Sequence, residues 1–257
     1  MPGLSALRPA FLLRLVVVGS AAVGLHLYLQ DAWELSEDVG GVGAFVTAVG
    51  TLYSVLTAFT VVSVWTEFTD TDRSIKREAR ELAELWRYVG YLTDDEGVGR
   101  ARAAIERYRD EVVSTEWPTM ERGGSATAAE DEFFAMADAV NRIEARTARD
   151  VPAWAEAVRT LGAVSDARSD RILLVGLRMP VLLKLLLYMA TATLIGGMVL
   201  LGFASGLIGG VLISLTVAVS LLVLEVIDDI DDPFGGAWGV TSQPFERVKF
   251  GAEGAPS

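Results

Sequence analysis

The stretch LLLYMATATLIGGMVLLGFASGLIGGVLISLTVAVSLLVL, from Leu185 to Leu224, runs for forty residues without one charged side chain. A helix needs roughly 20 apolar residues to cross the hydrocarbon core of a bilayer, so this stretch is long enough for two spans. Ser205 and Gly206 near its middle predict the turn between them. A second charge-free stretch runs from Val42 to Val64, and a long, highly charged segment separates the two. The pattern predicts an integral membrane protein.

We expect four transmembrane helices in all, with the ranges Ala10–Leu29, Val42–Trp65, Pro180–Phe203 and Leu207–Val226. The first range also has features of a secretory signal peptide, because Arg8 and Arg14 precede an apolar run that contains the small residues Ser20, Ala21 and Ala22. The apolar run continues past these residues to Leu29, which favours a membrane span.

Basic residues flank the predicted spans on one side of the membrane. The loop Asp31–Asp38 has no Lys or Arg, whereas basic residues precede the first span, follow the second and precede the third. They are Arg8, Arg14, Arg73, Lys76, Arg77, Arg80, Arg168, Arg171, Arg178 and Lys184. The positive-inside rule therefore predicts that both termini and the segment between spans two and three lie in the cytoplasm. Arg14 and Lys184 lie one turn inside their spans and are expected to snorkel to that face.

The charged segment has the apolar periodicity of amphipathic helices. One predicted helix, Ile75–Val89, extends the second span, and the others cover Val98–Val112, Phe133–Ile143 and Trp154–Ile172. Trp117 and Pro118 are expected to end the second of these, and Pro152 to interrupt or follow the third. No segment alternates with period two, so no strand is expected.

The predicted fold is an all-α membrane protein with a helical cytoplasmic domain inserted between spans two and three. Its domains are 1–66 for the first two spans, 67–179 for the cytoplasmic domain, 180–227 for the last two spans and 228–257 for an acidic Pro-Phe-Gly segment and tail. The Gly-rich tail after Val248 is predicted to be disordered.

Composition excludes several kinds of site. The chain has no cysteine and one histidine, so disulfides, thiolate metal sites, cysteine nucleophiles and histidine-clustered zinc are ruled out. Its formal charge of -12 argues against nucleic acid as a partner, since binding would need a positive surface. The sequence has no phosphate-binding glycine loop or nucleophile elbow, so no enzymatic activity is expected. Arg far outnumbers Lys, which indicates a GC-rich prokaryotic genome.

Five carboxylates gather where the fourth span ends, namely Glu225, Asp228, Asp229, Asp231 and Asp232. On a helix, all of these except Asp231 fall at i, i+3, i+4 and i+7, and so share one face. Such a cluster needs neutralising, and Ca²⁺, which takes six to eight oxygens, is one candidate. The alternative is a solvated helix end balanced by arginines such as Arg171 or Arg178. The spacing does not match an EF-hand loop.

Small and hydroxyl-bearing residues form a stripe along the second span: Thr47, Gly50, Thr51, Ser54, Thr57, Ala58 and Val61. The stripe could line a wet pore or allow helices to pack closely. Glu67 and Asp70 follow the span, where they could form a cation-attracting ring in an oligomer or begin a solvated helix. His26 is expected near the outer interface, where an unpaired histidine costs little.

Three parts of the chain together resemble the bacterial bestrophin-like family of membrane proteins. The first is Gly50-Thr51-Leu52-Tyr53 continuing through Trp65 to Ile75-Lys76-Arg77-Glu78-Ala79, and the second is the arginine-bearing helix from Arg168 to Pro180. The third is Asp229-Ile230-Asp231-Asp232-Pro233-Phe234-Gly235-Gly236, followed by Gln243-Pro244-Phe245. The resemblance covers most of the chain through short motifs.

Members of that family mostly lack an assigned activity, so the expectation comes from the true bestrophins. These are pentameric four-span ion channels whose second spans line the pore, and an Asn-Pro-Phe-Gly sequence followed by acidic residues helps them hold Ca²⁺. Asp232-Pro233-Phe234-Gly235 is similar, but here the acidic residues precede the Pro-Phe-Gly. The second span also lacks the paired phenylalanines of a bestrophin neck.

The resemblance and the residues together predict an oligomeric, cation-permeable channel in the cytoplasmic membrane of a prokaryote. The second span would line the pore, with Thr47, Thr51, Ser54 and Ala58 facing it. The expected partners are the bilayer, further copies of the chain (five by the resemblance) and inorganic ions. The alternative is a non-conducting scaffold or sensor that binds a partner through its cytoplasmic helices.

Overall fold

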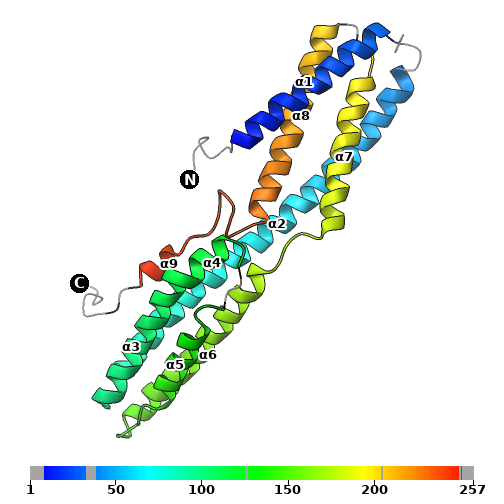
Figure 1. Ribbon diagram of the computed structural model, residues 1–257. Helices are drawn as coiled ribbons and strands as arrows, with labels where there is room; N and C mark the ends of the chain where they lie inside the picture. The colour runs from blue at the N-terminus through cyan, green and yellow to red at the C-terminus, as the bar shows by residue number, and fades with distance from the viewer. Residues whose placement is uncertain (1–8, 33–38, 125–126, 204, 249, 251–257) are drawn as a thin grey trace, which may run out of the picture. The chain divides into compact units, whose positions relative to one another are not determined.

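The computed structural model describes residues 9–32, 39–124, 127–203, 205–248 and 250 (Figure 1). Every regular element in these residues is a helix and none of them lies in a strand, which confirms the predicted all-α fold. The chain forms two compact units. The membrane unit comprises Met1–Thr66, Arg178–Asp232 and Gly236–Trp238, and the extramembrane unit comprises Glu67–Leu177, Pro233–Gly235 and Gly239–Ser257.

Among the described residues, four helices are long and apolar enough to cross a membrane, as predicted. They are α1 (Pro9–Ala32), α2 (Val39–Val89), α7 (Val181–Leu200) and α8 (Gly206–Ile230). The second span and the helix after it form the single 51-residue helix α2, whose first part belongs to the membrane unit and whose remainder belongs to the extramembrane unit. Most large apolar side chains of the membrane unit are exposed, which suits contact with lipid.

A small core holds α1 against α7 and α8, built around Ala22, Val199, Ile213 and Val217. His26 is fully buried beside this core, and its Nδ1 lies 2.9 Å from the carbonyl oxygen of Val199. The expectation of an unpaired histidine near the interface is therefore wrong. Gly209 provides the space, because a Cβ there would lie 2.7 Å from the His26 Nε2.

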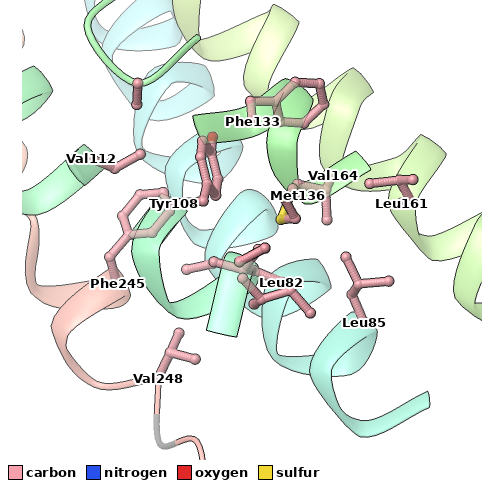
Figure 2. Close-up of a cluster of buried hydrophobic side chains, with 14 of the residues drawn as sticks. Leu82, Leu85, Tyr108, Val112, Phe133, Met136, Leu161, Val164, Phe245 and Val248 are labelled. Atoms are coloured by element: carbon pink, nitrogen blue, oxygen red, sulfur yellow. The ribbon is translucent and has the colours of Figure 1, made fainter. Parts of the chain in front are cut away.

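The extramembrane unit packs the end of α2 with α3 (Asp95–Glu111), a π-helical turn (Val112–Glu116), α4 (Trp117–Glu121), α5 (Glu130–Asn141), α6 (Asp150–Val175) and α9 (Gln243–Glu246). Figure 2 shows its core, where Leu82 and Leu85 of α2 meet Tyr108, Met136 and Val164. Phe245 and Val248 are buried in the same core, so the segment around α9 is part of this unit.

The predicted stop at Trp117 and Pro118 is wrong, because the helix continues to Glu121. The π turn makes this possible: the Trp117 N–H donates to the carbonyl of Val112, five residues back, just before a proline that has no N–H. At about 100° per residue, the extra residue rotates Trp117 and Met120 back to the buried side of Tyr108. Both side chains are buried.

The other prolines and the chain ends fit the expectations only in part. Pro152 lies in the first turn of α6, where a missing N–H costs nothing. Ile143 lies beyond the end of α5. Arg8 and most of the loop Asp31–Asp38 lie outside the described residues, as does the tail after Val248 apart from Phe250, whose ring contacts Trp86.

Candidate functional site

The membrane part of α2 presents three faces. Thr47, Thr51, Ser54 and Ala58 are exposed on one face, which we call the hydroxyl face. A second exposed face is apolar and carries Leu52, Val55, Phe59 and Val62. The third, made by Tyr53, Thr57, Thr60 and Val64, is buried within the unit. At about 100° per residue, the apolar face lies opposite the buried one and the hydroxyl face lies between them.

The seven residues of the predicted stripe are therefore divided. Thr47, Thr51, Ser54 and Ala58 are exposed, Gly50 and Val61 are half-buried, and Thr57 is buried. A neighbouring part of α2 packs closely against α7, since a Cβ on Gly197 of α7 would lie only 2.8 Å from the Val46 side chain. The stripe thus combines a packing edge with an exposed polar face.

The hydroxyls of this face all bond back to their own helix. Thr47 donates to the Gly43 carbonyl at 2.8 Å, Thr51 to the Thr47 carbonyl at 2.9 Å and Ser54 to the Gly50 carbonyl at 2.8 Å. A hydroxyl has one proton to donate and two acceptor lone pairs, so these oxygens present acceptors outward and keep their protons occupied. The exposed polar atoms are suited to a cation or to water hydrogens.

A groove of about 510 Å³ runs along the hydroxyl face within the membrane unit. Thr47, Thr51 and Ser54 of α2 line one side of it, and Leu194 of α7 with Thr216, Val219 and Ser220 of α8 line the rest. Its lining is uncharged and rich in hydroxyls, as a wet path through a bilayer requires.

The two acidic residues predicted at the mouth of the pore differ in their surroundings. Glu67 and Asp70 are both exposed on α2 at the start of the extramembrane unit. The Asp70 Oδ1 accepts a hydrogen bond from Arg73 Nη1 at 2.9 Å, so its charge is paired within the same helix. Glu67 is consequently the better candidate for an acidic ring.

The five carboxylates at the end of α8 have partners within the chain. Lys184 Nζ of α7 lies 2.8 Å from the Asp228 Oδ1 and 3.2 Å from the Asp231 Oδ2. Arg178 pairs with Asp232 at 2.7 Å, and Arg14 lies 3.9 Å from Glu225. The alternative in which arginines such as Arg178 balance the cluster therefore accounts for two of the five, Asp232 and Glu225.

Asp229 is held by the turn that follows α8. Its two carboxylate oxygens accept the backbone N–H groups of Ala237 and Trp238, at 2.7 and 3.0 Å. Gly236 allows this turn, because a Cβ there would collide with the Asp229 carbonyl oxygen and lie 2.9 Å from that of Asp232. The turn after α8 thus brings its backbone N–H groups back to the Asp229 carboxylate.

This arrangement does not fit a calcium ion. Calcium takes six to eight oxygens that converge on one point, whereas these carboxylate oxygens are directed at ammonium, guanidinium, hydroxyl and amide donors. Within the described part of the chain, no group of three acidic or histidine side chains has an arrangement that could hold a metal. No step is therefore assigned to calcium here.

The Pro-Phe-Gly sequence after the carboxylates has a structural role in the extramembrane unit. Phe234 is buried, and its ring meets Trp117 edge-on with 5.4 Å between the centroids. The Val240 N–H donates to the Pro233 carbonyl at 2.7 Å and closes the turn around it. The family model of the Bestrophin-like domain matches residues 6–245, which include this sequence and every site residue described above.

The chain belongs to the bestrophin-like family. No curated protein and no solved structure matches it. The family assignment confirms the predicted resemblance and fits an all-α membrane protein, but names no ion and no partner.

The bestrophin-like protein also has a buried ionic network that the sequence alone did not indicate. Arg171 of α6 has its Nε 2.6 Å from Glu78 Oε2 and its Nη2 2.7 Å from Glu116 Oε1. Arg168 donates to both Glu116 oxygens at 3.1 Å, and Tyr108 donates to Glu78. Arg171 therefore does not balance the acidic segment, contrary to one alternative. The sequence feature that could have pointed to this network is Glu78, a charged residue on the apolar stripe that begins at Ile75.

Burial and charge fix the protonation states of this network. Burial and the Glu78 carboxylate raise the pKa of Tyr108 well above its ordinary value, so its hydroxyl keeps its proton. Burial would lower the pKa of Arg171, but the carboxylates of Glu78 and Glu116 outweigh it and raise that pKa. Burial would likewise raise the pKa of Glu116, yet Arg171 and Arg168 hold it below its ordinary value. Two cations thus face two anions, which ties α2, α6 and the π turn together.

Proposed function

We propose that this bestrophin-like protein is an oligomeric, cation-permeable ion channel whose α2 helices line the pore. The observation that supports it is the hydroxyl face of α2. Thr47, Thr51 and Ser54 are exposed on a helix that is long and apolar enough to span a membrane. Lipid gives such a face no partners, whereas a water-filled path between copies of the chain would hydrate it.

The direction of the hydroxyl hydrogen bonds supports a preference for cations. Anions need donors, and the donors on this face are occupied by the carbonyls one turn back. Cations need acceptor oxygens, which the face presents. Glu67 adds an exposed carboxylate on the same helix, in the extramembrane unit, where a ring of such groups would attract cations.

The proposal includes an assembly and a location. The bestrophins supply the number of copies, five, and the positive-inside pattern places both termini and the extramembrane unit in the cytoplasm. The cytoplasmic membrane of a prokaryote is the site proposed for it. Both exposed faces of α2 are available for such an assembly, since the described residues cover neither of them.

Ion flux through the purified protein in liposomes tests the proposal. Gradients of KCl, potassium gluconate and choline chloride are compared, and we expect flux in both potassium salts and none in choline chloride. Flux that follows chloride would reject the cation preference. Absence of flux in all three salts would reject the channel and favour the scaffold that binds a partner through its helices.

A second experiment asks which face of α2 meets water. The chain has no cysteine, so single cysteines at Thr51 and at Val55 would be unique labelling sites. Blocking of flux by a water-soluble thiol reagent at position 51 but not at position 55 is expected. The reverse result would move the pore to the apolar face while leaving the channel itself in place.

A further inference from the structure

The acidic segment, Glu225 to Asp232, lies where α8 ends, and cationic side chains from elsewhere in the chain reach it, among them Arg14, Arg178 and Lys184. Lys184 lies closest to the centre, with its Nζ 2.8 Å from Asp228 and 3.2 Å from Asp231. We propose that the Lys184 ammonium is a built-in counter-cation that occupies the place of a divalent ion, so that the segment binds no calcium while Lys184 is present. This inference does not depend on whether the protein conducts.

Each carboxylate oxygen of the two central aspartates already has a donor within the chain. Asp228 accepts from Lys184 with one oxygen and from the Tyr188 hydroxyl with the other. Asp231 accepts from Lys184 with its Oδ2 and from the Met179 N–H with its Oδ1, at 2.7 Å. The Asp231 side chain is only 6% exposed, so its charge depends on these donors.

Lysine suits this role. Its ammonium is a compact charge with three donors, so one nitrogen can bridge two carboxylates. The chain is rich in arginine and has lysine only at Lys76, Lys184 and Lys249. One of these few lysines, Lys184, therefore lies where a compact charge bridges Asp228 and Asp231, which are one turn apart at the end of α8.

The other carboxylates have partners that a metal would have to displace. Arg178 holds Asp232 at 2.7 Å, and two backbone N–H groups hold Asp229. Three further donors join the start of α7 to the end of α8. The Met179 N–H and the Lys184 ammonium donate to Asp231, and the Tyr188 hydroxyl donates to Asp228. Hydrogen bonds within the chain thus join the start of α7 to the end of α8, a connection that a calcium ion could otherwise make.

Calcium binding to the full-length protein in detergent tests the proposal. Equilibrium dialysis with labelled calcium at about 1 mM, the weak end of calcium sites in proteins, should show no saturable binding to the wild type. The variant Lys184→Met frees Asp228 and Asp231 and should gain about one bound ion per chain, with a calcium-dependent rise in its melting temperature. Lys76→Met is the matched control, because Lys76 pairs with Asp72 at 2.5 Å on an exposed helix surface; it should bind none.

Two results would overturn the proposal. One is saturable calcium binding by the wild type that disappears in Asp228→Asn,Asp231→Asn. The other is a folded Lys184→Met that binds no calcium. If Lys184→Met does not fold, the double variant Lys184→Met,Asp228→Asn restores the local charge balance. Recovery of folding by this second change supports the counter-cation, and failure to recover rejects it.

Discussion

The guanidinium of Arg171 and the carboxylate of Glu78 form an ion pair in which Nε lies 2.6 Å from Oε2 and neither side chain is exposed. Both groups lost their hydration on folding, so the Glu78 carboxylate depends on Arg171, and the guanidinium depends on Glu78 and on Glu116, 2.7 Å from it. The pair joins α2 to α6 across 93 residues of sequence. Its removal should affect the whole extramembrane unit.

Arg171→Met is expected to lower the free energy of unfolding by about 3–5 kcal/mol, because it leaves the buried Glu78 carboxylate without its cation and Glu116 with Arg168 alone. Denaturant unfolding of the detergent-purified chain measures it. Arg159→Met is the control: its pair with Glu156, at 2.7 Å, is exposed on both sides, so its removal should leave the free energy of unfolding nearly unchanged. Equal effects of the two substitutions would contradict the role of burial.

Acid should destabilise the extramembrane unit through Asp150. The Thr93 hydroxyl, which donates to its Oδ2 at 2.7 Å, and the Thr147 N–H hold the pKa of Asp150 below its ordinary value of 3.8. A lowered pKa contributes stability that is complete above the ordinary value and is lost as the pH falls through the lowered one. Melting temperatures should therefore fall below about pH 4, and less steeply in Asp150→Asn. Parallel curves for the two proteins would contradict this assignment.

Thr51→Val should reduce potassium flux about fivefold, since it removes one acceptor oxygen per copy, worth about 1 kcal/mol, at constant shape. Thr193→Val is the matched control on α7: its hydroxyl is also exposed and also bonds one turn back, at 2.8 Å to the Met189 carbonyl. Liposome flux assays compare them. A similar loss in both variants would mean that the hydroxyl face of α2 has no special part in conduction.

Gly236→Ala should destabilise the protein by about 1–3 kcal/mol, because the added methyl group meets two carbonyl oxygens of the turn after α8. Thermal unfolding measures the change. Gly162→Ala makes the same chemical change in the middle of α6, with nothing within 4 Å, and should stabilise by about 0.5–1 kcal/mol. A neutral Gly236→Ala would show that the turn can open without cost.

Insertion of one alanine between Ser114 and Thr115 should add a second extra residue to this segment and rotate the helix after it by about 100°. Trp117 and Met120 would then leave the buried side, and Glu116 would lose Arg168 and Arg171. We expect unchanged helix content by circular dichroism with a large drop in melting temperature. Ser114→Ala, which changes an exposed position without lengthening the segment, should behave as wild type.

The spans could be predicted from the sequence because long charge-free runs have few other uses. Leu185–Leu224 predicts α7 and α8, and the periodicity from Ile75 predicts that α2 continues past the membrane. The helix end at Pro118 could not be placed correctly. Its local signal indicates a stop, and only the packing of Trp117 and the pairing of Glu116 favour the π turn that overrides it.

The candidate site was partly predictable for a similar reason. Helical spacing places Thr47, Thr51 and Ser54 on one face, and the structure keeps them exposed there. Which other residues face the neighbouring helices depends on tertiary contacts. Lys184 was expected to snorkel, but it reaches Asp228 and Asp231 more than forty residues away, a pairing that no local pattern encodes. The sequence likewise offers several acidic residues that could pair with Arg171, and their spacing does not single out Glu78 and Glu116.

Because Lys184 is covalently part of the chain, its positive charge is present at the acidic segment whatever ions the solution contains. A group attached to the chain stays at its partners at an effective concentration on the order of millimolar or higher, however dilute the medium. A chelator cannot remove it, and a rise in free calcium cannot add to it. The contact between the start of α7 and the end of α8 should therefore not depend on the concentration of free calcium.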